Sequence, residues 1–130
     1  MRPLQERWNA LSTGILLGVV WAGWHIVPLL QAERSLRWIG WWCLSTVALR
    51  VLMVWLYNNS GGSVFGAALF HGIGNVSWQL FPNYGSHYDP RIDGLIVACE
   101  AAIVTALWGP RTLARGGYSV GISQLSEDSR

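Results

Sequence analysis

Four stretches of mainly apolar residues, separated by short polar segments, make up most of the chain: residues 11–30, 36–57, 63–81 and 94–108. A helix needs about 20 residues to cross the bilayer core, and the first two stretches have that length. The pattern predicts an all-α fold, a polytopic membrane helix bundle with about four transmembrane helices. The last stretch is short and contains Glu100, so a tilted or partly buried helix is expected there.

The polar segments between these stretches are rich in turn-forming residues. They read QAERS, NNSGG and FPNYGSHYDPRID along the chain. After Trp108 the sequence becomes polar and rich in glycine and serine. We therefore expect one membrane domain over residues 1–108 and a flexible tail over residues 109–130.

Composition supports a membrane location. Hydrophobic residues make up 52% of the chain and charged residues 12%, whereas soluble domains carry about 25% charge. The net charge of +2 is small and the arginines form no dense patch, which argues against a nucleic-acid partner and leaves the lipid bilayer as the expected surroundings. Cys43 and Cys99 lie in apolar stretches and are expected to be buried free thiols.

The arginines also bear on orientation. Four spans place both termini on the same side of the membrane. That side would carry five arginines and the opposite loops three: Arg2, Arg7, Arg111, Arg115 and Arg130 against Arg34, Arg37 and Arg91. By the positive-inside rule the distribution favours a multi-pass protein with cytoplasmic termini.

Two histidines occur inside apolar stretches. In a helix, His25 lies about 20° from Gly14 and close to Gly18 and Ala22, on a stripe of small residues of the kind that lets membrane helices approach closely. His71 and Asn75 are about 40° apart on the third stretch. Polar groups in a membrane are costly, and this arrangement indicates a shared functional site facing the protein interior.

Structural roles are the alternative for these polar residues. Either histidine alone could simply bond a neighbouring carbonyl. Arg50 and Glu100, each inside an apolar stretch, are expected to pair with each other or with the backbone. His87 lies in a polar loop and is expected to be solvated.

Two motifs resemble a known family. WAGWHIVPLL, with Trp21, Trp24, His25 and Pro28, resembles the second motif of the CPBP family, the CAAX proteases and bacteriocin-processing enzymes also called the Abi family. LYNNSGGSVFGAALFHGIGNV resembles a later motif, a turn followed by a helix with H-x-x-x-N, here His71 and Asn75. The family's paired-glutamate motif E-E-x-x-x-R does not occur in this sequence, which looks like the C-terminal half of such a protein.

The resemblance implies a CAAX-type intramembrane endopeptidase, a hydrolase acting on peptide or protein substrates in the membrane, including prenylated CAAX tails. In the family the first-motif glutamate activates water with the help of the histidine that His25 matches. The residues that His71 and Asn75 match stabilise the oxyanion. Family members are also described as metalloproteases. His25 and His71 would then ligate zinc, although a third ligand is not evident and Glu100 matches no motif.

Three functional hypotheses follow. The first is a CPBP-type endopeptidase that is inactive as this isolated chain because the acidic motif is missing. The second is a non-catalytic pseudoprotease, membrane partner or immunity protein that uses the same cavity. The third is a haem protein, since two histidines on neighbouring membrane helices can be axial ligands.

Overall fold

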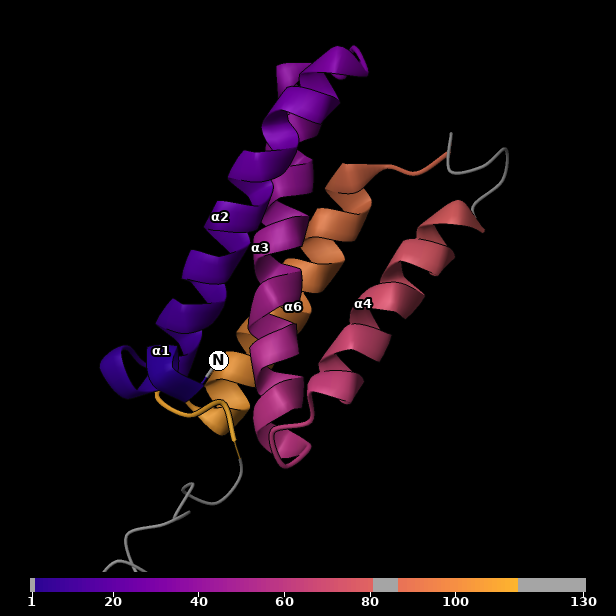
Figure 1. Cartoon of the computed structure of the whole chain (residues 1–130). Coiled ribbons are helices and arrows are strands. Elements are labelled where there is room, and N and C mark those ends of the chain that lie inside the picture. The colour runs from indigo at the N-terminus through magenta and orange to yellow at the C-terminus, as the bar shows by residue number, and fades with distance from the viewer. Residues whose placement is uncertain (1, 81–86, 115–130) are drawn as a thin grey trace, which may run out of the picture.

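The computed structural model describes residues 2–80 and 87–114, and these residues form helices and connecting turns without a β-strand. The all-α prediction is confirmed. Figure 1 shows the helices, which are α1 (Arg2–Arg7), α2 (Ala10–Gln31), α3 (Leu36–Asn59), α4 (Val64–Gln79) and α6 (Pro90–Trp108). Residues 81–86 and 115–130, including the expected end of the third apolar stretch and most of the expected tail, lie outside the described residues.

The helices begin where short polar side chains can cap them. Such a residue precedes each of the four long helices, and its side chain accepts a hydrogen bond from a backbone N–H of the first turn: Asn9, Ser35, Ser63 and Asp89. The turn between α3 and α4 uses Gly61 and Gly62, both with positive φ, a conformation that costs glycine little. The predicted turn is confirmed for residues 60–62 of the NNSGG segment, whereas Asn58 and Asn59 are the last residues of α3.

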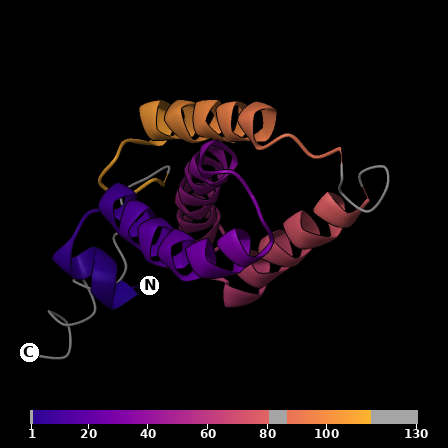
Figure 2. The ribbon, with the colours of Figure 1, turned by 90° about the horizontal axis from the view of Figure 1, so that it is seen from above.

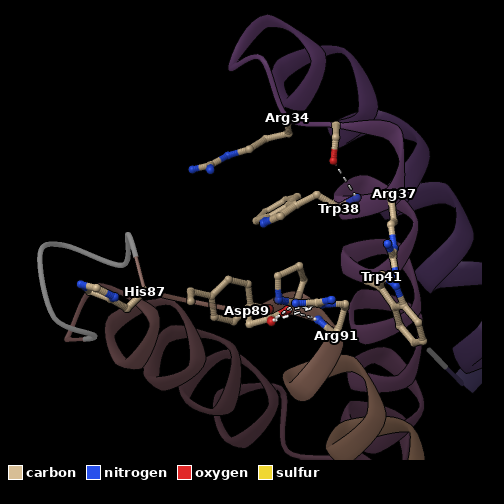
Figure 3. A pocket seen from close by; sticks show the side chains of 10 residues that line it. Arg34, Arg37, Trp38, Trp41, His87, Asp89 and Arg91 are labelled. Carbon is tan, nitrogen blue, oxygen red and sulfur yellow. Dashed lines mark hydrogen bonds and ion pairs between the residues drawn. The ribbon is translucent and has the colours of Figure 1, made fainter.

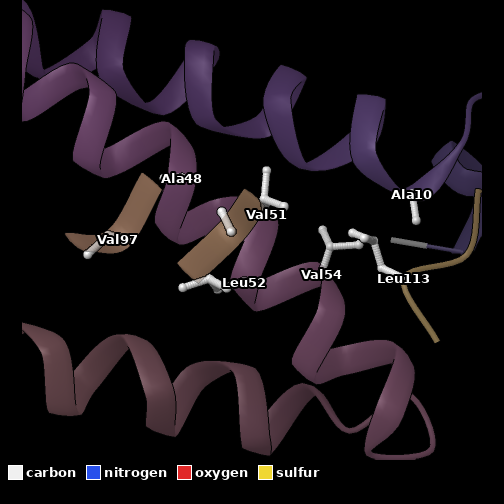
Figure 4. Packing of buried hydrophobic residues seen from close by; sticks show 8 residues of the cluster. Ala10, Ala48, Val51, Leu52, Val54, Val97 and Leu113 are labelled. Carbon is white, nitrogen blue, oxygen red and sulfur yellow. The ribbon is translucent and has the colours of Figure 1, made fainter. Parts of the chain in front are cut away.

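Helix α3 is the centre of the bundle. It packs against α2 and α6 extensively and against α4 less so, and Figure 2 shows these three helices arranged around it. The buried apolar cluster lies along α3, with Val51, Leu52 and Val54 contributing to it, as Figure 4 shows. Because α4 packs less extensively against α3, it depends less on the bundle core than α2 and α6 do.

Close packing of α2 on α3 uses the predicted stripe of small residues. Gly14, Gly18 and Ala22 are all buried. A Cβ added at Gly14 would lie 2.9 Å from the Cα of Val51, and one at Gly18 would lie 2.6 Å from the Cα of Val47. Only glycine permits this backbone approach, so the prediction that this stripe faces protein is confirmed.

Helices α2 and α3, with 22 and 24 residues, are long and apolar enough to cross a membrane. Their outer faces carry exposed apolar side chains such as Val20, Trp24 and Val27, which suit contact with lipid. Helix α4 has 16 residues, and α6 has 19 residues with Arg91, Asp93 and Glu100 among them. The chain is a helical membrane protein, whereas crossing by α4 and α6 and the side of the termini stay predictions.

The segment after α6 returns to the bundle. Leu113 is fully buried, and the backbone N–H groups of Ala10 and Leu11 donate to the carbonyls of Arg111 and Pro110. Residues 109–114, which belong to the expected tail, therefore pack against the start of α2. The domain boundary at residue 108 stays a prediction.

The two cysteines are free, as expected. Burial was predicted wrongly for Cys99, which is exposed because it lies on the side of α6 that faces away from α3.

Candidate functional site

The two predicted histidines meet at a tryptophan that comes from α2. The ring centroids of His25 and Trp21 are 5.1 Å apart with the rings tilted, and the edge contact between Trp21 and His71 has a centroid separation of 5.7 Å. Residues from α2 and α4, far apart in sequence, are thus brought to one indole. We call Trp21, His25, His71, Asn75 and Arg50 the histidine cluster.

His25 is half-buried and fixed in orientation. Its Nδ1 lies 2.9 Å from the carbonyl oxygen of Trp21, and its ring packs against Trp42 with a centroid separation of 5.4 Å. A carbonyl oxygen only accepts hydrogen bonds, so Nδ1 carries a proton and donates it. In the neutral imidazole the Nε2 lone pair then remains as an acceptor, which is the state that a general base requires.

His71 and Asn75 lie one turn apart on α4. The Asn75 side-chain amide Nδ2 is 3.4 Å from His71 Nε2, a long and weak hydrogen bond in which the amide donates. The proton of a neutral His71 then sits on Nδ1, and the second N–H of the Asn75 amide is not used by this bond. Two N–H donors from one helix face can be directed at a developing oxyanion.

Arg50, from α3, is the member of the cluster whose interaction partners were predicted wrongly. Its Cζ lies 4.6 Å from the centroid of the Trp21 ring, and its NH1 donates to the Met53 Sδ at 2.8 Å. The expected pairing with Glu100 or with the backbone is absent among the described residues, because Arg50 is buried against α2 and Glu100 is exposed on α6. A cation inside an apolar stretch is by default functional, and that signal was available in the sequence.

Electrostatic interactions also link members of the histidine cluster. His71 lies within electrostatic reach of both Arg50 and His25. Among the side chains that the structure describes Arg50 forms no ion pair, and four acidic residues are engaged or exposed elsewhere: Glu33, Asp89, Asp93 and Glu100. The cluster therefore presents a surplus of hydrogen-bond donors and positive charge, suited to an anionic group.

A metal site is not completed by these residues. A zinc site usually takes at least three protein ligands, and no group of three His, Cys, Asp or Glu side chains comes together within residues 2–80 and 87–114. His25 and His71 alone do not fit zinc, and Glu100 does not join them. Use of a metal remains a prediction that needs a further ligand.

His87 does not belong to the cluster. It is exposed and lines a separate cavity near the start of α6.

Comparison with known proteins identifies the family. The model of the type II CAAX prenyl endopeptidase Rce1-like family matches residues 1–77, which is more than half of the 130-residue chain and includes His25, His71 and Asn75. No curated protein and no solved structure matches the chain. The matched region spans α1 to α3 and most of α4, the segments that supply every member of the histidine cluster. The chain belongs to the Rce1-like family of CAAX-type intramembrane proteases.

Proposed function

We propose that this chain supplies the histidine and asparagine groups of an endopeptidase that hydrolyses peptide bonds at the membrane, in substrates that include prenylated CAAX tails. The observation that carries the proposal is the meeting of His25 and His71 at the indole of Trp21, within a region that matches a CAAX prenyl endopeptidase family. Family membership supports the reaction class, and the geometry of the histidine cluster supports the proposed division of roles.

His25 would be the base and positioning group for the attacking water. The bond from Nδ1 to the Trp21 carbonyl leaves Nε2 as the acceptor for a water proton. His71 and Asn75 would donate to the oxyanion that forms as the carbonyl carbon becomes tetrahedral. The water adds to the carbonyl carbon, and the proton held by the base then goes to the leaving amine.

A carboxylate is the missing part of this scheme. Among the described residues no acidic side chain contacts His25 or His71. We therefore infer that the isolated chain turns over substrate poorly or not at all. The protein would be multi-pass, with its termini on the cytoplasmic side.

The test is cleavage of a fluorogenic prenylated CAAX peptide by the chain in lipid vesicles, alone and together with a separate transmembrane segment that carries E-E-x-x-x-R. We expect no cleavage by the chain alone and measurable cleavage with the added segment, lost on His25→Ala. Cleavage by the chain alone that His25→Ala abolishes would contradict the inferred inactivity. Absence of cleavage under both conditions would contradict the endopeptidase role.

A non-catalytic pseudoprotease or partner subunit is the second candidate. The lack of a described carboxylate beside the histidines favours it, because donors without a base-activating acid can bind a peptide without cleaving it. Stoichiometric co-purification with a membrane partner, together with peptide binding that His25→Ala weakens and no hydrolysis, would favour this candidate over the first.

A further inference from the structure

A polar cavity lies apart from the histidine cluster, between the α2–α3 turn and the start of α6. Its volume is about 480 Å³, within the range of small-ligand sites. Figure 3 shows arginine and tryptophan side chains around it, and the lining includes Arg34, Arg37, Trp38, Trp41, Asp89 and Arg91. We call it the arginine cavity. None of His25, His71, Asn75 or Arg50 lines it.

The charges of the arginine cavity do not balance. Arg91 and Asp89 form an ion pair with an N–O distance of 2.8 Å, and the same Asp89 carboxylate accepts from the Arg91 Nε. Arg34 and Arg37 form no ion pair with the described carboxylates. The lining therefore has a formal surplus of two positive charges, which favours an anionic ligand.

The walls of the cavity are held in place. The Cζ of Arg34 lies 4.9 Å from the centroid of the Trp38 ring, and Tyr88 contacts the edge of the same ring. The Tyr88 hydroxyl donates at 2.7 Å to Asp93, which also accepts from the Ser45 hydroxyl of α3. Asp93 does not line the cavity, so the lining itself keeps its formal surplus of two positive charges.

The position of the cavity indicates the source of the anion. Helix α2 ends at Gln31 and α3 begins at Leu36, so the turn between two membrane-crossing helices lies at a membrane surface. Trp38 and Trp41 are in the first two turns of α3, where interfacial tryptophans are typical. Apolar side chains nearby, including Leu36 and Ile92, are largely exposed and could contact acyl chains.

We propose that the arginine cavity binds the phosphate of an anionic phospholipid headgroup in the leaflet that contains the α2–α3 turn. Guanidinium groups match phosphate oxygens in two-point hydrogen bonds, and Arg34 and Arg37 are the two without a carboxylate partner. A free phosphate shares this chemistry. The headgroup is the assigned source because the cavity lies at the lipid surface beside exposed apolar residues.

The experiment is lipid analysis by native mass spectrometry, after reconstitution in nanodiscs with equimolar phosphatidylglycerol and phosphatidylcholine. We expect the wild type to retain phosphatidylglycerol selectively. The double variant Arg34→Gln/Arg37→Gln should retain at least about tenfold less of this lipid, because each hydrogen bond to a charged group contributes about a factor of ten to affinity. The control is Arg7→Gln/Arg111→Gln, the same change in charge at the opposite end of the bundle, and it should behave as the wild type does.

Three results would overturn the proposal. They are equal retention of the two lipids by the wild type, equal loss in both double variants, and unchanged retention in Arg34→Gln/Arg37→Gln. Inorganic phosphate is the second probe, added to lipid-free protein in detergent. A rise in Tm with phosphate that Arg34→Gln/Arg37→Gln abolishes, without lipid selectivity, would assign the cavity to free phosphate instead. Circular dichroism of each variant checks that the helices are retained.

Discussion

The guanidinium of Arg50 lies over the indole of Trp21, with the Cζ 4.6 Å from the ring centroid. The same indole contacts His25 and His71, so one side chain joins polar residues from α2, α3 and α4. A buried cation without a described carboxylate partner needs another favourable interaction, and the face of an indole provides one. Trp21 therefore links the stability of the bundle to the geometry of the histidine cluster.

Replacing Trp21 by leucine should destabilise the protein. Loss of a desolvated cation–π contact costs about 2 kcal/mol, and Arg50 would lose it while remaining buried. Thermal unfolding in detergent measures the change as a lower Tm. Trp24→Leu is the matched control, because Trp24 is one turn away on α2 and 80% exposed. Equal effects of the two substitutions would contradict a specific role for Trp21.

Gly18→Ala should separate α2 from α3. The added Cβ would lie 2.6 Å from the Cα of Val47, a backbone atom that cannot move aside alone. Overpacking of this kind costs about 1–3 kcal/mol, measurable as a decrease in the free energy of unfolding. Gly23→Ala on the same helix meets nothing within 4 Å and should be neutral or stabilising by up to about 1 kcal/mol. If Gly18→Ala were also neutral, close helix approach would not limit stability.

Predictability from the sequence differed between backbone packing and side-chain contacts. The stripe of Gly14, Gly18 and Ala22 was predictable because helical periodicity fixes which residues share a face. The contact of His71 with Trp21 required the rotation of α4 about its own axis and its tilt toward α2. Those quantities come from packing against α3 and are not encoded in either helix alone, so Arg50 was recognised as costly but given the wrong partner.

Stability should fall at alkaline pH because of Tyr88. Burial raises the pKa of the Tyr88 phenol above its ordinary value, and the hydrogen bond to Asp93 raises it further. The folded state then holds this proton more tightly than the unfolded state does. Its contribution to stability is complete below about pH 10, the ordinary pKa, and is lost as pH rises through the higher folded value.

Thermal unfolding measured between about pH 8 and about pH 11, a range that includes the ordinary tyrosine pKa of about 10, tests this dependence. Tyr88→Phe should have a lower Tm at pH 8, since it cannot donate to Asp93, and a flatter alkaline decline than the wild type. Tyr57→Phe removes a tyrosine of α3 and should keep the wild-type slope. An unchanged slope in Tyr88→Phe would assign the decline to another group.

The last prediction separates the roles of the histidine cluster and uses the peptide assay with the added acidic segment. His25→Gln should lower turnover by about 10²–10⁴-fold, the usual contribution of a general base. Asn75→Ala should lower it by about 10²–10³-fold through loss of an oxyanion donor. His87→Gln, at the arginine cavity, should leave turnover unchanged. His71 and Asn75 would act on the same oxyanion. A variant with both of these residues replaced should therefore lose less turnover than the product of the losses from replacing each one alone. Fully multiplicative losses would mean that the two side chains act independently, and unchanged turnover in Asn75→Ala would remove Asn75 from the oxyanion site.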